Sequence, residues 1–281
     1  MIANNLPISR VGGLRNRLLA PLGFGWADWR LAVNFARMML RDRFLGSSLG
    51  SIWAVLNPAL MLLLFCFVFT NIIKSRLPGS DSSLAFVIWL VSGYGPWLAI
   101  SEALNNATHS VVAQAGIVKN MAFKTELLPL SATAVAFVPL GVSLFILLGL
   151  LALDGRGPNL AWLILPVVIG LQMVFLAGVG LLLAASNVFV RDIGQILPNV
   201  LTLVLFVSPI FYSLEQFPAL IRPIAAWNPF FLIANGYREP IVHGQVQPLT
   251  QLVVLVLLAV TTLGFGLWYF RRLKTYFSGR I

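Results

Sequence analysis

Charged residues are scarce in this chain of 281 residues. They make up 10% of the sequence, with nine Asp and Glu, two His and a single Cys. One cysteine excludes an intramolecular disulfide, and no Cys/His cluster has the spacing of a metal site, so we expect no metal. No GxxxxGKS/T loop occurs, which excludes ATP binding by that route. The scattered acidic residues argue against an ion-driven pump and provide no candidate catalytic residue.

Apolar residues dominate instead, at 59% of the sequence with a mean hydropathy of +0.90. A helix needs about 20 apolar residues to cross a bilayer, where lipid offers the backbone no hydrogen-bond partner. We therefore expect an all-α integral membrane protein with six transmembrane helices. Pro139 and Pro166 are expected to kink the third and fourth spans. The spans are expected at about 51–73, 84–104, 127–153, 160–190, 196–214 and 249–270.

The net charge of +10 comes from 19 Lys and Arg. On a soluble protein this charge would suggest nucleic-acid binding, but here the loops divide it unequally, and we expect no nucleic-acid partner. With a cytoplasmic N-terminus, 14 basic residues fall in inner segments and five in outer segments. The positive-inside rule therefore predicts that both termini are cytoplasmic. The outer residues are Lys74, Arg76, Arg156, Arg222 and Arg238.

We divide the chain into a cytoplasmic tail (1–25), an amphipathic helix (26–45), a six-span domain (51–270) and a second cytoplasmic tail (271–281). In the amphipathic segment, basic residues lie opposite Trp, Phe, Leu and Met, a pattern typical of a helix in the membrane interface. Such a helix is either a passive topology anchor or a docking element for a cytoplasmic partner. Its polar face carries Arg30, Asn34, Arg37 and Arg41.

The segment before the last span, 215–246, is too apolar for a solvated loop and too broken for a span. Two short half-helices that re-enter the outer leaflet would satisfy both facts. Irregular backbone at that depth is tolerated only where protein or a water-filled cavity surrounds it. The alternative is a surface cap anchored by Trp227, Phe230 and Phe231. The prolines that break the segment are Pro218, Pro223, Pro229 and Pro240.

A polar stripe at helical spacing marks the inner end of the second span: Glu102, Asn105, Asn106 and His109. Polar side chains in a span face the bundle interior or a water-filled path. The stripe therefore predicts a polar cytoplasmic mouth for a hydroxyl-rich substrate. The alternative is that the helix has already left the membrane and exposes its wet face, which the end of the apolar run near Leu104 favours.

Aromatic residues are a second candidate set for a substrate path, because sugar rings stack on aromatic faces. We expect about a third of them to face a path and the others to pack in the core or at the membrane interface, since one stripe of a helix faces inward. The candidates are Trp89, Tyr94, Trp97, Phe211, Tyr212, Trp227, Phe230 and Phe231, with Phe65, Phe67 and Phe69.

The inner loop at 115–129 is short and basic. It carries two apolar side chains among polar neighbours, and we expect them to be exposed. A short helix that presents an aromatic side chain suits docking into a groove on a partner. The alternative is an ordinary connection between two spans. The residues concerned are Lys119, Asn120, Met121, Phe123 and Lys124.

Four stretches of the sequence resemble the permease subunits of polysaccharide ABC exporters, and the O-antigen exporter permeases (type-2 ABC permeases) in particular. The resemblance covers nearly the whole chain after residue 26, with the stretches in family order. They are RDRFLGSSLGSIWAVLNPALMLLLFCFVF (41–69), KNMAFKTELLPLS (119–131), NVFVRDIGQILPNVLTLVLFVSPIFYS (187–213) and WNPFFLIANGYRE (227–239).

The resemblance implies a homodimer that forms one channel in the bacterial inner membrane, with two copies of a separate ATPase below it. That ATPase would bind ATP and Mg and drive a lipid-linked polysaccharide outward, while this chain would hold no cofactor and be no enzyme. The broken segment would form the outer gate. Arg191 and Asp192 would lie at the inner end of the fourth span, in the short turn before the fifth, where the residues themselves predict a local ion pair. The ATPase-facing residues would be Arg37, Arg41, Lys119, Asn120, Met121, Phe123 and Lys124.

Other functions compete with this one. The same family includes exporters of capsule and teichoic acid. An ABC permease for lipids or drugs would be favoured by an apolar vestibule. A membrane-embedded glycosyltransferase would need acidic residues to bind a metal and a sugar nucleotide, and the nine Asp and Glu are too scattered for that.

Overall fold

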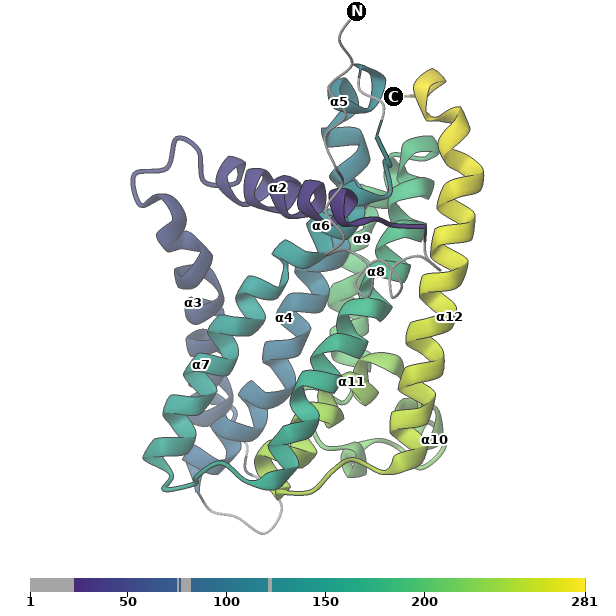
Figure 1. Ribbon diagram of the computed structural model, residues 1–281. Helices are drawn as coiled ribbons and strands as arrows, with labels where there is room; N and C mark the ends of the chain where they lie inside the picture. Colours follow the sequence, from purple (N-terminus) through teal and green to yellow (C-terminus); the bar gives the residue numbers. More distant parts are fainter. Residues whose placement is uncertain (1–22, 75, 77–81, 121–122, 281) are drawn as a thin grey trace, which may run out of the picture.

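The computed structural model describes residues 23–74, 76, 82–120 and 123–280, and within these ranges every regular element is helical (Figure 1). The predicted all-α fold is confirmed. The longer helices are α2 (Trp26–Asp42), α3 (Trp53–Phe67), α4 (Ser83–Ala113), α6 (Leu127–Val135), α7 (Phe137–Leu153), α8 (Leu165–Phe189), α9 (Asp192–Val207), α11 (Pro229–Arg238) and α12 (Leu249–Leu273). The shorter elements are η3 (Gly50–Ile52), η4 (Val68–Ile72), α5 (Ala115–Asn120), η5 (Leu160–Ile164), η6 (Leu214–Gln216), α10 (Arg222–Ala226), η7 (Glu239–His243) and η8 (Lys274–Gly279).

Five helical stretches in the described ranges are long and apolar enough to cross a bilayer, and they match five of the six expected spans. The remaining expected span corresponds to α9, an apolar helix of 16 residues. At 1.5 Å per residue this helix extends about 24 Å, less than the ~30 Å of a hydrocarbon core. The count of six spans therefore stays a prediction. The five stretches are Gly50–Ile72, Ser83–Ala113, Leu127–Leu153, Leu160–Phe189 and Leu249–Phe277.

One of the two prolines expected to bend spans lies beside a break in its helix. The third span divides at Ala136 into α6 and α7, three residues before Pro139. Proline lacks the N–H that would bond to the carbonyl four residues earlier, here that of Val135, the last residue of α6. Pro166 instead lies in the first turn of α8, where that N–H would have no intrahelical partner. The helix changes from η5 to α8 at Leu165, and the expected kink at Pro166 stays a prediction.

α4 is the central helix of the bundle and packs against α6, α7, α8, α9 and α11. It continues nine residues past the expected end of the second span, to Ala113, so the polar stripe is fully helical. Of the 18 most apolar consecutive residues in this helix, 78% are buried inside the chain. In the stretch that contains α3 the corresponding share is 11%. α3 stands at one side of the bundle in Figure 1. Its apolar surface is left to lipid or to another protein.

Two glycines allow α8 and α12 to pack closely. A Cβ on Gly178 would lie 2.4 Å from the carbonyl carbon of Thr262, and one on Gly266 would lie 2.4 Å from the carbonyl oxygen of Gly178. Small residues let helix backbones approach one another in membranes. The crossing therefore fixes the C-terminal helix against the bundle.

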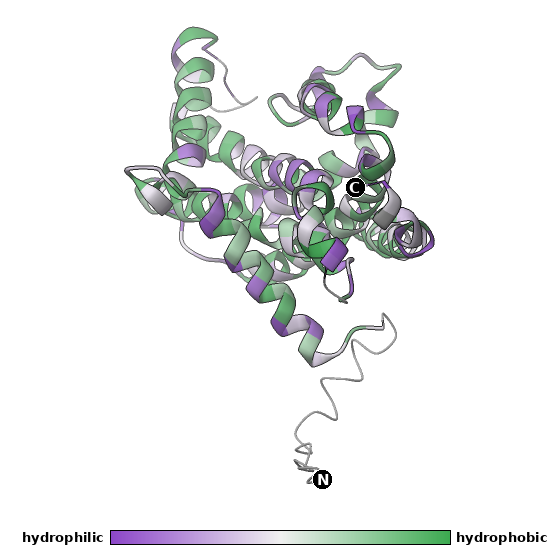
Figure 2. Cartoon of the chain, turned by 90° about the horizontal axis from the view of Figure 1, so that it is seen from above, coloured by the Kyte–Doolittle hydropathy of each residue, from purple (hydrophilic) through white to green (hydrophobic). Residues whose placement is uncertain are grey.

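α2 lies across one end of the bundle, which also holds α5 and η8 and which we call the α2 end (Figure 1). The expected amphipathic helix is present and ends at Asp42, three residues early. Figure 2 looks down on this end and shows hydrophilic and hydrophobic residues alternating along α2. The apolar side packs on α6 through the buried Phe35, and Ser131 donates a hydrogen bond to the Ala32 carbonyl (2.9 Å).

The opposite end, which we call the α10 end, holds the proline-broken segment (Figure 1). It folds into η6, α10, α11 and η7, and the longest of these has 10 residues. Leu232, Ile233 and Tyr237 of α11 are fully buried against the bundle. The α11 part of the segment is thus packed against the bundle, whereas residues 218–224 are exposed, and the depth of the segment in the membrane stays a prediction.

Candidate functional site at the α2 end

A cavity of about 400 Å³ lies at the α2 end, between α2, α4 and α6, and we call it the stripe cavity. Three residues of the predicted polar stripe line it: Asn105, Asn106 and His109. Asn105 is oriented by a hydrogen bond from its amide to the Ser101 carbonyl (2.8 Å). The stripe therefore faces a cavity beneath α2. The remaining lining residues are Met39, Arg43, Ser110, Ala113, Gln114, Ala132 and Val135.

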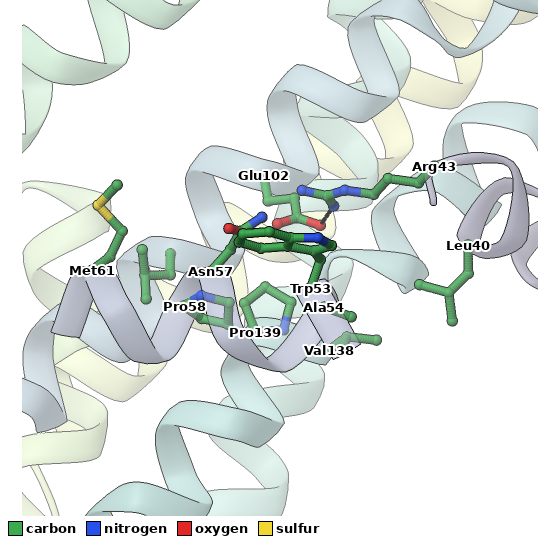
Figure 3. Close-up of a pocket in the computed structure, with 11 residues that line it drawn as sticks. Leu40, Arg43, Trp53, Ala54, Asn57, Pro58, Met61, Glu102, Val138 and Pro139 are labelled. Atoms are coloured by element: carbon green, nitrogen blue, oxygen red, sulfur yellow. Dashed lines mark hydrogen bonds and ion pairs between the residues drawn. The ribbon is translucent and has the colours of Figure 1, made fainter. Parts of the chain in front are cut away.

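The fourth stripe residue, Glu102, forms an ion pair with Arg43 at the end of α2 (Figure 3). A second cavity of about 150 Å³ lies beside this pair, between α2, α3, α4 and α7, and we call it the Trp53 cavity. Arg43 lines both cavities, so the ion pair lies at their boundary. Figure 3 shows Trp53 and Asn57 of α3 beside the Glu102 carboxylate.

Sequence reasoning did not single out Arg43, Trp53 or Asn57 as site residues. Arg43 entered only as one of the inner positive charges. The available signal was a Trp and an Asn four residues apart at the start of an apolar run, which places both on one helix face. That signal does not reveal which helix the face meets.

The residues expected to face an ATPase fall into two groups. Arg37 and Arg41 on α2 and Lys119 and Asn120 on α5 are exposed at the α2 end. Phe123 is not the exposed side chain that was expected. Its ring is partly buried against the Phe35 ring, with centroids 5.4 Å apart, because α2 presents an apolar face there. Met121 lies outside the described residues.

Lys124 connects the same loop to the start of α2. Its Nζ forms an ion pair with Asp28 (2.5 Å) and donates to the Gly23 carbonyl (2.7 Å). Burial raises the pKa of Asp28, but hydrogen bonds from the Gly25 N–H and from Lys124 outweigh this effect, so the pKa lies below its usual value. Lys124 is thus engaged within the chain.

Glu126, which sequence reasoning missed, joins this loop to the C-terminal helix. Its buried carboxylate accepts hydrogen bonds from Lys274 Nζ (2.8 Å) and Arg271 Nε (3.2 Å). Burial raises the pKa of Glu126, but the two cations lower it by more than burial raises it, so the pKa lies below its usual value. The Phe24 ring lies between Lys124 and Arg271: its centroid is 5.6 Å from Lys124 Nζ and 5.7 Å from the Arg271 guanidinium. We call Asp28, Lys124, Glu126, Arg271 and Lys274 the charged collar.

Most of the aromatic candidates pack inside the chain. Trp89, Tyr94, Trp97 and Phe211 are buried, and Phe231 is 7% exposed. The Phe211 ring lies 5.3 Å from that of Tyr94. Further ring contacts join Phe65 to Tyr94 (4.7 Å), Phe65 to Phe211 (4.9 Å), Phe69 to Phe211 (5.1 Å) and Trp97 to Phe230 (5.6 Å).

Trp227 differs from these residues, because half of its surface is exposed at the α10 end. Tyr212 is partly exposed and donates a hydrogen bond to the Phe206 carbonyl. Phe67, also among the candidates, is 54% exposed on α3. The structure thus brings the buried rings together around α4, with Tyr212 packed at the edge of that cluster and Trp227 and Phe67 largely exposed. A channel-lining role for any of them stays a prediction.

Sequence reasoning also assigned no site role to Arg238, whose guanidinium is buried at the α10 end. It donates hydrogen bonds to the carbonyls of Pro209 (2.8 Å) and Ile210 and lies 3.8 Å from the centre of the Trp89 ring. Gly93 makes room for it, since a Cβ there would lie 2.2 Å from a guanidinium nitrogen. Arg238 therefore ties α11 to α4 and to the backbone that follows α9.

The expected ion pair between Arg191 and Asp192 is wrong: in the described part of the chain the two side chains are not paired with each other. Asp192 starts α9 and Arg191 precedes it, and neighbouring residues of a helix point in different directions. The start of α9 is held instead by Asn187. Its side chain accepts from the Gly194 N–H (3.0 Å) and donates to the Thr108 carbonyl (3.0 Å).

Within the described ranges, no group of three or more His, Cys, Asp and Glu side chains could hold a metal ion. The charged groups of the site are the Arg43–Glu102 pair at the boundary of the two cavities and the ion pairs of the charged collar. The stripe cavity adds the amides of Asn105 and Asn106 and the imidazole of His109. This arrangement can bind polar groups by hydrogen bonds and transmit movement between helices.

The family model described as ABC-2 type transporter matches residues 30–242. The O-antigen export system permease protein RfbA of Klebsiella pneumoniae is 24% identical over 249 residues, which cover 88% of this chain and 93% of the relative. The protein of the same name from Myxococcus xanthus is 26% identical over 235 residues, 83% of this chain and 88% of the relative. The polysialic acid transport protein KpsM of Escherichia coli is 25% identical over 234 residues, 83% and 89% respectively.

Proposed function

Because the chain belongs to the ABC-2 type transporter family, we propose that it is the transmembrane permease subunit of an ATP-driven exporter of a lipid-linked polysaccharide. The observation that carries the proposal is the agreement of relatives aligned over more than four fifths of the chain. The names of these relatives describe O-antigen export and polysialic acid transport. Both cargoes are polysaccharides, so the polymer class is the part of the function that the relatives share.

The proposed subunit lies in the bacterial inner membrane with both termini in the cytoplasm, so the α2 end is the cytoplasmic end. The charge asymmetry of the loops supports this orientation. α9, extended by the residues that follow it to 214, is the fifth of six spans. The segment 215–246 re-enters the outer leaflet at the α10 end. The burial of α11 against the bundle supports this, because irregular backbone at membrane depth needs surrounding protein.

In this proposal two copies of the chain assemble with two copies of an ABC ATPase, which binds ATP and Mg. The exposed apolar surface of α3 supports an association with a second copy. Within one chain, only 11% of the most apolar 18 residues of Gly50–Ile72 are buried. The proline-broken segment forms the outer gate of the channel. Trp227 is the aromatic residue placed to meet the polymer there, because it is the half-exposed one.

The ATPase contacts the exposed basic surface of α5 and α2, formed by Lys119, Asn120, Arg37 and Arg41. Phe123 and Lys124 act one step further inside, because both contact α2: Phe123 packs on the Phe35 ring, and Lys124, which is still 41% exposed, pairs with Asp28. A displacement of this loop passes to α2 through Asp28 and to α12 through Glu126. The charged collar is thus the mechanical connection between the ATPase contact and the spans.

The proposal is tested by deleting the gene in cells that make the polymer. We expect loss of surface polysaccharide and accumulation of lipid-linked polymer in the cytoplasm. The full chain, purified alone, should hydrolyse no ATP, and should copurify with an ABC ATPase when the two are coexpressed. Unchanged surface polysaccharide after deletion would refute the proposal.

One observation favours a second candidate, a permease for lipids or drugs. An apolar cavity of about 280 Å³ lies beneath α2, between α6, α8 and α12. It includes Trp29, Met173 and Leu267, and Asp28 is its one charged lining residue. Export of a fluorescent lipid by the reconstituted exporter, with no effect of deletion on surface polysaccharide, would favour this candidate.

A further inference from the structure

We propose that the stripe cavity and the Trp53 cavity together form a binding site for a sugar unit, with the Arg43–Glu102 ion pair as a movable wall between them. This inference rests on the proposed function, because it places one step of polymer recognition at the α2 end. The two cavities share Arg43. Glu102 lines the smaller one, and Asn105, one helical turn further along α4, lines the larger one.

The polar groups of the two cavities match a sugar. Hydroxyl groups both donate and accept hydrogen bonds, and so do the amides of Asn57 and Asn106. Within the described ranges neither of these amides makes a hydrogen bond to the protein, so both are available to a ligand. Arg43 adds donors in a fixed planar arrangement, and Glu102 adds acceptors.

The site also supplies the apolar face that a sugar ring needs. The indole ring of Trp53 lies beside the Glu102 carboxylate, with the rings of Pro58 and Pro139 next to it (Figure 3). A saccharide can place its C–H face on the indole and direct its hydroxyls toward the carboxylate and the amides. This combination of one aromatic face with convergent planar polar groups is typical of small-molecule sites.

Charge decides between a sugar and a phosphate group. Arg43 and Glu102 are the two Asp, Glu, Lys or Arg side chains that line the cavities, and their charges cancel. A phosphate site would carry an excess of cations or backbone N–H groups. A balanced pair between amides instead suits an uncharged polyhydroxyl ligand.

The wall between the cavities is built to open. The stripe cavity, at about 400 Å³, falls within the ~300–1,000 Å³ of ligand sites, whereas the Trp53 cavity, at about 150 Å³, lies below it. The ion pair is partly exposed, with Arg43 39% and Glu102 19% accessible, and exposed pairs add little to stability. Hydroxyls can therefore replace its hydrogen bonds and join the two volumes.

The test uses the complete exporter in cells that produce the polymer. A photoreactive benzoylphenylalanine is placed at Met39, which lines the stripe cavity, or at Leu40, which lines the Trp53 cavity. The matched control places it at Phe145 on α7, which is 79% exposed and lines neither cavity. After irradiation the chain is purified and stained for glycan by periodate oxidation and hydrazide coupling, which needs no knowledge of the sugar.

We expect glycan-stained adducts at positions 39 and 40, none at position 145, and none in cells in which polymer synthesis is blocked. Trp53→Ala should lower the adduct yield at Met39 about fivefold, the ratio that corresponds to loss of one ring contact. Trp268→Ala, which removes a half-exposed ring on α12, should leave the yield unchanged.

Absence of adducts at both cavity positions, in variants that still export polymer, would overturn the sugar site and leave the proposed function standing. An equal yield at positions 39, 40 and 145 would also overturn it. Normal surface polymer in cells that lack the chain would overturn the proposed function itself. Export by each photoreactive variant is measured in parallel, so a variant that fails to fold is recognised and replaced by its neighbour in the same cavity.

Discussion

Replacing Glu126 with Gln should destabilise the protein, because its carboxylate is buried between two cations. The Glu126 side chain is 2% exposed and bonds to two cations that lie 145 and 148 residues further along the chain. Gln keeps the shape and one acceptor oxygen but removes the negative charge. Arg271 and Lys274 then face each other across a neutral amide at the end of α12.

The magnitude follows from burial. Removing one partner of a buried ion pair costs about 3–5 kcal/mol when the other charge stays buried. Here the two cations are 39% and 35% exposed, so water recovers part of the loss. Gln also retains a hydrogen bond. We therefore expect a loss of about 2 kcal/mol in the free energy of unfolding, or about 4–8 °C in Tm on the scale of soluble domains.

The assay is thermal unfolding of the purified full chain in detergent. Size-exclusion chromatography after heating measures the fraction that stays folded at each temperature. Asp154→Asn is the matched control, because Asp154 pairs with Arg156 (2.6 Å) at partly exposed positions of 19% and 41%. Exposed pairs contribute about 0–1 kcal/mol, so the control should shift Tm little. Equal Tm values for the two variants would refute the idea that Glu126 anchors the collar.

Three further predictions concern pH, packing and topology. The pKa values of Asp28 and Glu126 are both lowered, so the stability that these carboxylates contribute is present above the usual carboxyl range and is lost as the pH falls through the lowered values. Tm should therefore drop as the pH falls below the usual carboxyl range, and drop less in the Glu126→Gln variant. Gly178→Ala should reduce Tm, because the added Cβ meets the backbone of Thr262, whereas Gly170→Ala, on the same helix with open space around it, should not; equal effects would contradict the close α8–α12 crossing. A phosphatase active only in the periplasm, fused after Ile281, should be inactive, and strong activity would overturn the orientation.

The fold class and the positions of five spans follow from the apolar runs of the sequence. A transmembrane helix is a run of apolar residues of a length set by the bilayer, and such a run is visible in one dimension. The same holds for the amphipathic helix at the start of the chain and for the break near Pro139, which depends only on the missing N–H.

Tertiary structure alone decided which polar residues meet. Arg43 and Glu102 are separated by 59 residues, and Glu126 and Lys274 by 148, so no local pattern relates either pair. Their partners depend on which helix faces lie against each other. Those faces are set by close contacts such as the glycine crossing of α8 and α12 and by the burial of Arg238 beside Gly93. For the same reason the sequence did not distinguish buried aromatic rings from exposed ones: composition locates a ring in a span, but only packing around α4 decides which side of that span is covered.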